Sequence, residues 1–247
     1  MNISIAAEPL WWIGSFPVTN AFSVTLIVSV IIVVTSLVLR MRTFQIVPTG
    51  LQNALEAFVE NFRNLVQSVT ENQQLTTRLF PIITTFFLFI LLSNWSGLLP
   101  GFGTIGIREH GEIIPFGRAA TADLNTTIAL SLISVFAVQF IGISVLGLRG
   151  YAKKFFVSPL HKPYVIGTIV GLFELMGEMT KLISFSFRLF GNIFAGEVLL
   201  IVISNLVPYI FPLPFLALEV FAGLVQAGVF AILTLVFLKM ATLPAAH

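Results

Sequence analysis

A small group of charged and amide side chains lies inside long apolar runs of this sequence, where such groups are costly. Arg188, Asn192 and Glu197 belong to the stretch SFSFRLFGNIFAGE, and Glu219 and Gln226 lie in the next apolar run. A charge at the centre of a bilayer costs about 3 kcal/mol on insertion scales, so residues of this kind mark ion pathways. Carboxylates can take up and release protons, whereas an arginine stays charged. These five residues are therefore candidates for proton translocation.

The composition excludes a soluble protein. The 247 residues are 57% hydrophobic and only 10% charged, with a mean hydropathy of +0.99. The net charge is +2 and the basic residues are scattered, so we expect no nucleic-acid partner. The chain has no cysteine, and its histidines lie in predicted loops or at the terminus, so we expect no metal site and no cofactor. It also lacks a GxxxxGK[ST] loop for binding nucleotide phosphates.

Five apolar runs are long enough to cross a bilayer, which takes about 20 residues of helix. They cover residues 21–39, 79–98, 125–148, 165–207 and 215–238, and Pro81 is expected to begin the second. The fourth run would be about 64 Å long if straight, twice a membrane thickness, so it must tilt, bend or begin outside the bilayer. The sequence thus predicts an all-α integral membrane protein, a single domain over 1–247, ending in a long tilted helix pair.

Residues 51–70 predict a different kind of helix. Apolar residues recur at helical spacing on one face, and the other face is polar. The polar face carries Glu56, Glu60, Arg63, Asn64 and Gln67. Such an amphipathic helix lies on the membrane surface or against a partner and does not span the bilayer.

The distribution of basic residues predicts the orientation, because Lys and Arg concentrate in cytoplasmic loops. With five spans, nine basic residues fall on one side: Arg40, Arg42, Arg63, Arg78, Arg149, Lys153, Lys154, Lys162 and Lys239. Arg108 and Arg118 fall on the other side. The N-terminus is therefore expected outside and the C-terminus in the cytoplasm. The sequence shows no paired interrupted helices, a feature of many secondary transporters.

The fourth span carries a polar stripe that changes face at Arg188. At about 100° per residue, Lys181, Glu174, Glu178 and Asn192 fall between about +20° and +80° of the arginine. Glu197 falls near 180° and about 13 Å further outward. Beside the stripe lie three small residues that would let another helix approach closely: Ser184, Gly191 and Ala195.

The last span supplies complementary groups. Glu219 and Gln226 are seven residues apart and share a face, and Glu219 is expected at the same depth as Glu197. Neither acid has an obvious basic partner on its own face, so we expect the two to share a proton as a coupled pair. Small residues at 223, 227 and 231 are expected to bring the last two spans together, and Asp123 could join the acids from the outer mouth of the third span.

Structural roles are the alternative for each of these residues. Arg188 could be a bundle-stabilising ion pair with Glu174, Glu178 or Glu197. Lys181 and the two acids before it could simply compensate one another's charge at helical spacing. Gln226 and Asn192 could be interhelical hydrogen-bonding residues.

Four motifs, KLISFSFRLFGNIFAGE, EVFAGLVQAGVFAILTLVFLKMA, TADLNTT and SNWSGLLPG, resemble subunit a of the rotary F-type ATP synthase. The resemblance covers nearly the whole chain and implies a stator subunit against a rotating ring of subunit c. It also implies that this subunit is not catalytic, which agrees with the absence of a GxxxxGK[ST] loop. It implies that Arg188 faces the ring carboxylate, that Asn192, Glu197, Glu219 and Gln226 line the outer half-channel, and that Lys181 and Glu174 flank the cytoplasmic one. The implied partners include the peripheral-stalk subunit b, other synthase subunits and the lipid bilayer.

The implied location is the bacterial plasma membrane, with a thylakoid membrane as the alternative. Two other functional readings stay open at this point. A stand-alone proton channel or proton-coupled carrier would place the same charges along a pore. A purely structural membrane scaffold would tolerate neutral substitutions of Glu197 and Glu219.

Overall fold

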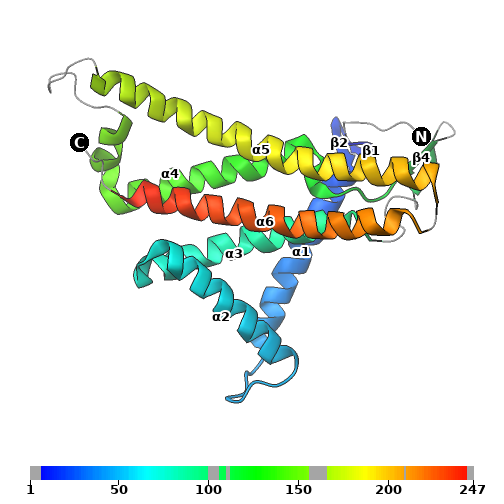
Figure 1. Ribbon diagram of the computed structural model, residues 1–247, viewed down its shortest axis with the longest axis horizontal. Helices are drawn as coiled ribbons and strands as arrows, with labels where there is room; N and C mark the ends of the chain where they lie inside the picture. The colour runs from blue at the N-terminus through cyan, green and yellow to red at the C-terminus, as the bar shows by residue number, and fades with distance from the viewer. Residues whose placement is uncertain (1–6, 100–105, 110–111, 156–165, 209, 244–247) are drawn as a thin grey trace.

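The computed structural model describes residues 7–99, 106–109, 112–155, 166–208 and 210–243. Long helices dominate these residues, and five of them are apolar enough to cross a membrane (Figure 1). They are α1 (Asn20–Met41), α3 (Gln73–Ser96), α4 (Leu124–Phe155), α5 (Ile166–Leu206) and α6 (Pro212–Thr242). The amphipathic α2 spans Leu51–Thr70. The predicted all-α architecture with five spans is confirmed.

Helices α3 to α6 lie side by side, and α1 crosses them at a steep angle (Figure 1). The two long C-terminal helices, α5 and α6, run antiparallel and adjacent. At 41 residues, α5 would measure about 61 Å. It is one continuous helix from Ile166 to Leu206.

The start of α3 differs from the prediction. Pro81 lies inside the helix, which begins at Gln73, because Asn72 supplies a strong N-cap. The Asn72 side-chain oxygen accepts hydrogen bonds from the backbone N–H groups of Gln74 and Leu75, at 2.9 and 3.1 Å. Because the first turn of α3 is polar, the run of apolar residues does not show where the helix begins.

The end of α4 also differs, because the helical path continues beyond residue 148 to Phe155. Gly147 interrupts it with φ 73° and ψ 159°, a conformation that glycine adopts without a side-chain clash. After this kink the chain folds back, and the Tyr151 ring packs where Gly142 has no side chain. The Tyr151 hydroxyl donates a 2.6 Å hydrogen bond to Gln139 Oε1.

Two short antiparallel hairpins were not predicted from the sequence. One pairs β1 (Pro9–Ile13) with β2 (Phe16–Thr19), and the other pairs β3 (Gly106–Glu109) with β4 (Glu112–Pro115). Asn20, the first residue of α1, directly follows β2. Its buried side chain donates a hydrogen bond to the Pro115 carbonyl of β4 at 3.4 Å and so links the two hairpins. A one-turn 3₁₀ helix, η1 (Ala120–Ala122), leads from the second hairpin into α4.

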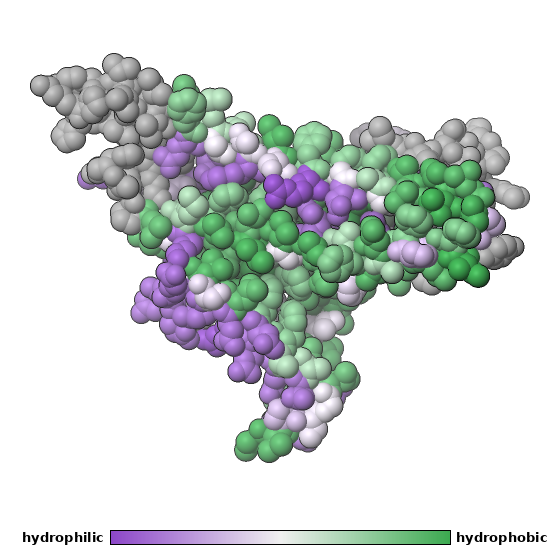
Figure 2. Space-filling view, in the orientation of Figure 1, coloured by the Kyte–Doolittle hydropathy of each residue, from purple (hydrophilic) through white to green (hydrophobic). Residues whose placement is uncertain are grey.

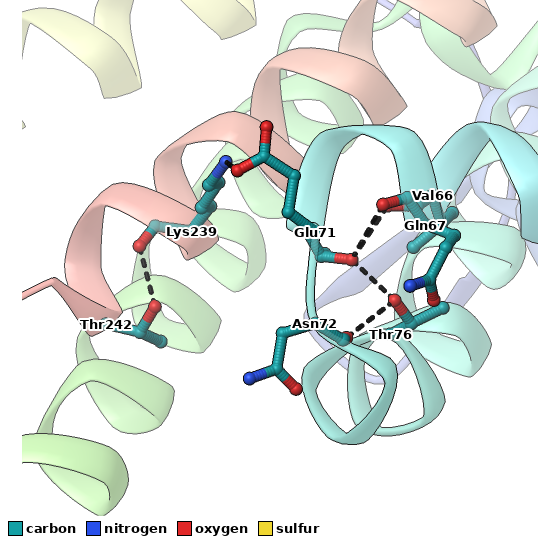
Figure 3. Close-up of polar contacts among 8 residues, drawn as sticks. Val66, Gln67, Glu71, Asn72, Thr76, Lys239 and Thr242 are labelled. Carbon is teal, nitrogen blue, oxygen red and sulfur yellow. Dashed lines mark hydrogen bonds and ion pairs between the residues drawn. The ribbon is translucent and has the colours of Figure 1, made fainter.

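The opposite end of the bundle is held by contacts between α6 and the corner that joins α2 to α3 (Figure 3). Lys239 Nζ lies 3.1 Å from Glu71 Oε2. Glu71 ends α2 in the left-handed region with φ 56°. Nearby, Arg78 Nη2 donates to Ser144 Oγ at 2.7 Å. Basic residues of α3 and α6 therefore gather at this end, as the orientation argument requires.

Candidate functional site

Arg188 lies on the outward face of α5, away from the core of the chain. Phe185, Leu189 and Ile193 are buried at a spacing of four, whereas Arg188 and Asn192 between them are exposed. This alternation follows from the helical period, which turns successive positions to different faces. Figure 2 shows a hydrophilic patch midway along α5 within a largely hydrophobic surface.

The Arg188 guanidinium has no carboxylate partner among the described residues. Its Nη2 donates to Ser184 Oγ at 3.2 Å, one turn earlier on the same helix. No described acid lies within ion-pair distance, so the structure does not support a bundle-stabilising ion pair as its role. A Cβ added at Gly191 would meet nothing within 4 Å. The small-residue surface beside Arg188 is therefore open to another molecule.

The charges nearer the Lys239 end of the bundle compensate one another. Lys181 Nζ lies 2.6 Å from Glu178 Oε1 and 4.5 Å from the centroid of the Phe237 ring in α6. The other oxygen of Glu178 is buried and has no hydrogen-bond partner among the described residues. Glu174 is half-buried one turn earlier. Lys181 and Glu178 thus compensate each other's charge, as the structural alternative predicted. One buried oxygen of the Glu178 carboxylate takes no part in this ion pair.

Helices α5 and α6 approach each other closely at the level of the two outer acids. The Glu219 carboxylate lies against Gly196, in the space that a side chain at that position would fill. Glu219 is only 5% exposed and has no hydrogen bond or ion pair within the described part of the chain. Glu197 is the next residue after this glycine, so the structure brings both acids to the same level.

Glu197 has a basic partner, which comes from outside its own helix face. Arg118 Nε lies 3.0 Å from Glu197 Oε2, and the arginine side chain is 7% exposed. Arg118 comes from the segment between β4 and η1, not from either long helix. The angular positions of residues around the long helices give no sign of this contact, because Arg118 lies outside those helices. Glu197 and Glu219 therefore have unequal surroundings, and a proton shared between them stays a prediction.

Gln226 lies between the outer acids and the level of Arg188. It is seven residues after Glu219, about 10 Å along the antiparallel α6, which returns it to the level of Leu189. It is 8% exposed, and like Asn192 it makes no hydrogen bond to another described residue. The interhelical hydrogen bonds that were the alternative role for these two amides do not occur within the described chain.

The small face of α6 packs against α5 at Ala227, which clusters with Phe185 and Leu189, but Gly223 packs differently from the prediction. A Cβ at Gly223 would come within 3.1 Å of Asn94 Cβ in α3, so this glycine lets α3, not α5, approach. Asn94 Nδ2 donates to the Gly223 carbonyl at 2.9 Å, and its oxygen accepts from Thr121 at 2.6 Å. Backbone carbonyls of α6 attract donors from α3, which explains the choice of partner. This tie positions α6 against the bundle and leaves its Glu219 face for α5.

The structure does not bring Asp123 into contact with Glu197 or Glu219. Its Oδ1 accepts from the backbone N–H and side-chain amide of Asn125, at 3.1 and 3.2 Å, at the start of α4. Asp123 also lines a largely apolar cavity of about 1020 Å³ between α1, α3 and α4. Its described role is to begin α4.

Several residues named in the sequence analysis lie outside the part of the chain that the structure describes. Lys162 and the histidines at 110, 161 and 247 lie outside the described residues, as do the side chains of Arg108, Lys153 and Lys154.

The carboxylates of this arrangement are groups that can bind and release protons. No group of three or more metal-ligating side chains occurs in the described ranges. Two acids and an amide lead from one end of the α5–α6 pair toward Arg188, and a second set of charges approaches it from the other end. A comparison with protein families finds that residues 21–239 match the family model described as ATP synthase A chain.

Proposed function

Because this chain belongs to the ATP synthase A chain family, subunit a, we propose that it conducts protons through two half-channels that meet at Arg188. Membership makes the chain a non-catalytic, multi-pass membrane subunit of the F-type ATP synthase, with a proton-conducting stator role.

The observation that carries the proposal is the exposed Arg188 without a carboxylate partner. An arginine within a spanning helix is costly unless an opposite charge or water compensates it. Its neighbours on the face are small, and a Cβ at Gly191 would meet only open space. A helix of another subunit with a carboxylate fits this surface in shape and charge. We assign the ring of subunit c as that partner and its carboxylate as the group that Arg188 attracts.

The proposed outer half-channel follows the α5–α6 contact. It begins at Glu197 and Glu219 and continues past Gln226 and Asn192 toward Arg188. Its acids are close to one another, since Glu219 lies against Gly196. A proton entering here can reach a ring carboxylate that has just left the arginine.

The proposed cytoplasmic half-channel lies at the other end of α5. Its residues lead from the end of the bundle that carries Lys239 toward Arg188: Glu174, Glu178, Lys181 and Ser184. The buried oxygen of Glu178 without a hydrogen bond offers an acceptor on this path. Asp123 has no place on either path by its described contacts, and we assign it to the start of α4.

Arg188 separates the two paths. One elementary charge crossing the membrane potential is worth about 2.3 kcal/mol per 100 mV, and a continuous path would dissipate that energy. An arginine cannot relay protons, since it stays protonated in proteins. Protons are thus forced to travel on the rotor between the half-channels, and ion flow becomes rotation.

We further propose the plasma membrane of a bacterium as the location, with the N-terminus outside and the C-terminus in the cytoplasm. The gathering of Arg78 and Lys239 at one end of the bundle supports this orientation. The peripheral-stalk subunit b and the remaining synthase subunits are the other proposed protein partners. The family match argues against a stand-alone channel or carrier and against a purely structural scaffold.

Reconstitution tests the proposed division of labour between this chain and the ring. Liposomes containing the purified chain alone should be as tight to protons as empty liposomes, because each half-channel ends inside the membrane. Liposomes containing the chain with the c-ring and the remaining synthase subunits should acidify when ATP is added. Measured with a pH-sensitive dye, proton conduction by the chain alone would instead support a stand-alone channel.

A further inference from the structure

Arg118 is a buried charge that the proposed half-channels leave without a role. Its Nε donates to Glu197 Oε2 at 3.0 Å, and its guanidinium carbon lies 5.6 Å from the centroid of the Phe194 ring. Only 7% of the arginine side chain is exposed, against 30% of Glu197. A charge-assisted hydrogen bond in such a poorly solvated place is stronger than one at a surface.

The segment that carries Arg118 is fixed to α3 and α5 by packing. Ala119 and Ala122 are buried against Ile193 of α5. At Gly97, which follows α3, a Cβ would come within 2.7 Å of Ala119 Cβ, so the absence of a side chain there lets the segment approach. The guanidinium therefore reaches Glu197 from a rigid frame. A donor held in this way sets the position of its acceptor.

Glu219 is held differently. It is buried to 5% exposure beside Gly196, yet no described residue hydrogen bonds to it or forms an ion pair with it. To carry a proton, Glu197 must weaken its contact with a buried arginine, which is costly. Glu219 faces no such cost and needs only water to take up and pass on a proton.

We propose that Arg118 is a positioning residue of the outer half-channel, which immobilises Glu197 so that the transported proton is exchanged by Glu219. This inference rests on the proposed half-channel. It adds a residue from outside the long helices to that path and gives the two acids unequal tasks. Glu197 is a fixed carboxylate that shapes the path, and Glu219 is the group that binds and releases the proton.

The test uses the complete synthase in membrane vesicles, with ATP-driven acidification divided by the amount of assembled complex. Arg118→Gln should lower this ratio about tenfold or more, as expected when a group that organises proton transfer is lost. Arg118→Lys should restore part of the activity, since it keeps the charge. The double variant Arg118→Gln/Glu197→Gln should pump better than Arg118→Gln, because it no longer leaves a half-buried carboxylate without its arginine.

Two results would overturn the inference. One is that Arg118→Gln lowers only the amount of assembled complex and leaves pumping per complex unchanged, which would make the contact merely structural. The other is a double variant no better than Arg118→Gln. Neither result bears on Arg188: pumping that survives Arg188→Ala would refute the proposed function itself, whatever the Arg118 variants do.

Discussion

Replacing Arg188 with alanine is expected to abolish ATP-driven proton pumping while the synthase still assembles. The side chain makes one described hydrogen bond, to Ser184 on its own helix, so its removal leaves the packing of this chain intact. A ring carboxylate at this level then meets no positive charge to stabilise its deprotonated form, so it keeps its proton. Loss of one preorganised electrostatic group at such a step lowers rates by about 10²-fold or more. Acidification of vesicles by ATP measures the effect.

Two further variants sharpen this result. Arg188→Lys keeps a positive charge but loses the planar fork, and a lysine can lose its proton when desolvated, so most coupled transport should still disappear. Arg42→Ala removes an exposed arginine at the end of α1 and should pump like the unaltered complex. Wild-type pumping by Arg188→Ala would contradict the account, and near-normal pumping by Arg188→Lys would show that a point charge is enough.

Replacing Glu219 with glutamine is expected to be the second most damaging change. The amide has nearly the same size and still fits beside Gly196, but it cannot bind and release a proton. Since the acid is buried and has no described partner, we expect a loss of about 10²-fold in pumping per complex, the lower range for a lost proton-transfer group. Glu197→Gln should lose less, because Arg118 already prevents that acid from exchanging freely.

Surface and packing variants serve as controls for Glu219. Glu71→Gln makes the same chemical change in an exposed ion pair with Lys239, and such pairs contribute little, so pumping should be close to normal. Gly196→Val should resemble Glu219→Gln, since the new side chain would occupy the place of the Glu219 carboxylate. If Glu197→Gln proved more damaging than Glu219→Gln, the assignment of unequal tasks would be wrong.

The sequence predicted the spans well because hydropathy and helical period act over many residues. The runs at 165–207 and 215–238 correspond to α5 (Ile166–Leu206) and α6 (Pro212–Thr242). The period also placed Arg188 and Asn192 on one face, where the structure has both exposed. Boundaries failed where local polar chemistry decided them, as at Asn72, whose cap begins α3 at Gln73, six residues before the predicted start at residue 79.

Contacts between distant segments could not be predicted in the same way. Arg118 lies in a loop, and nothing in its spacing connects it to Glu197, which is 79 residues later. Gly196 gave a weak signal, since a small residue directly before an acid in a spanning helix suggests close packing there. Small residues on α6 show that a helix can approach, but not which one. At Gly223 the hydrogen bond from Asn94 favours α3.

The central claim, two separate paths that end at Arg188, is tested most directly by access to single cysteines from either side of the membrane. The natural chain contains no cysteine, so Gln226→Cys and Glu174→Cys each give it one thiol. Silver ions, which follow water and bind thiols, are added to right-side-out or inverted vesicles, and the thiols that remain are counted after denaturation. The account predicts protection of Gln226→Cys only from the outer side and of Glu174→Cys only from the cytoplasmic side. Protection of either thiol from both sides would reveal a continuous path and contradict it.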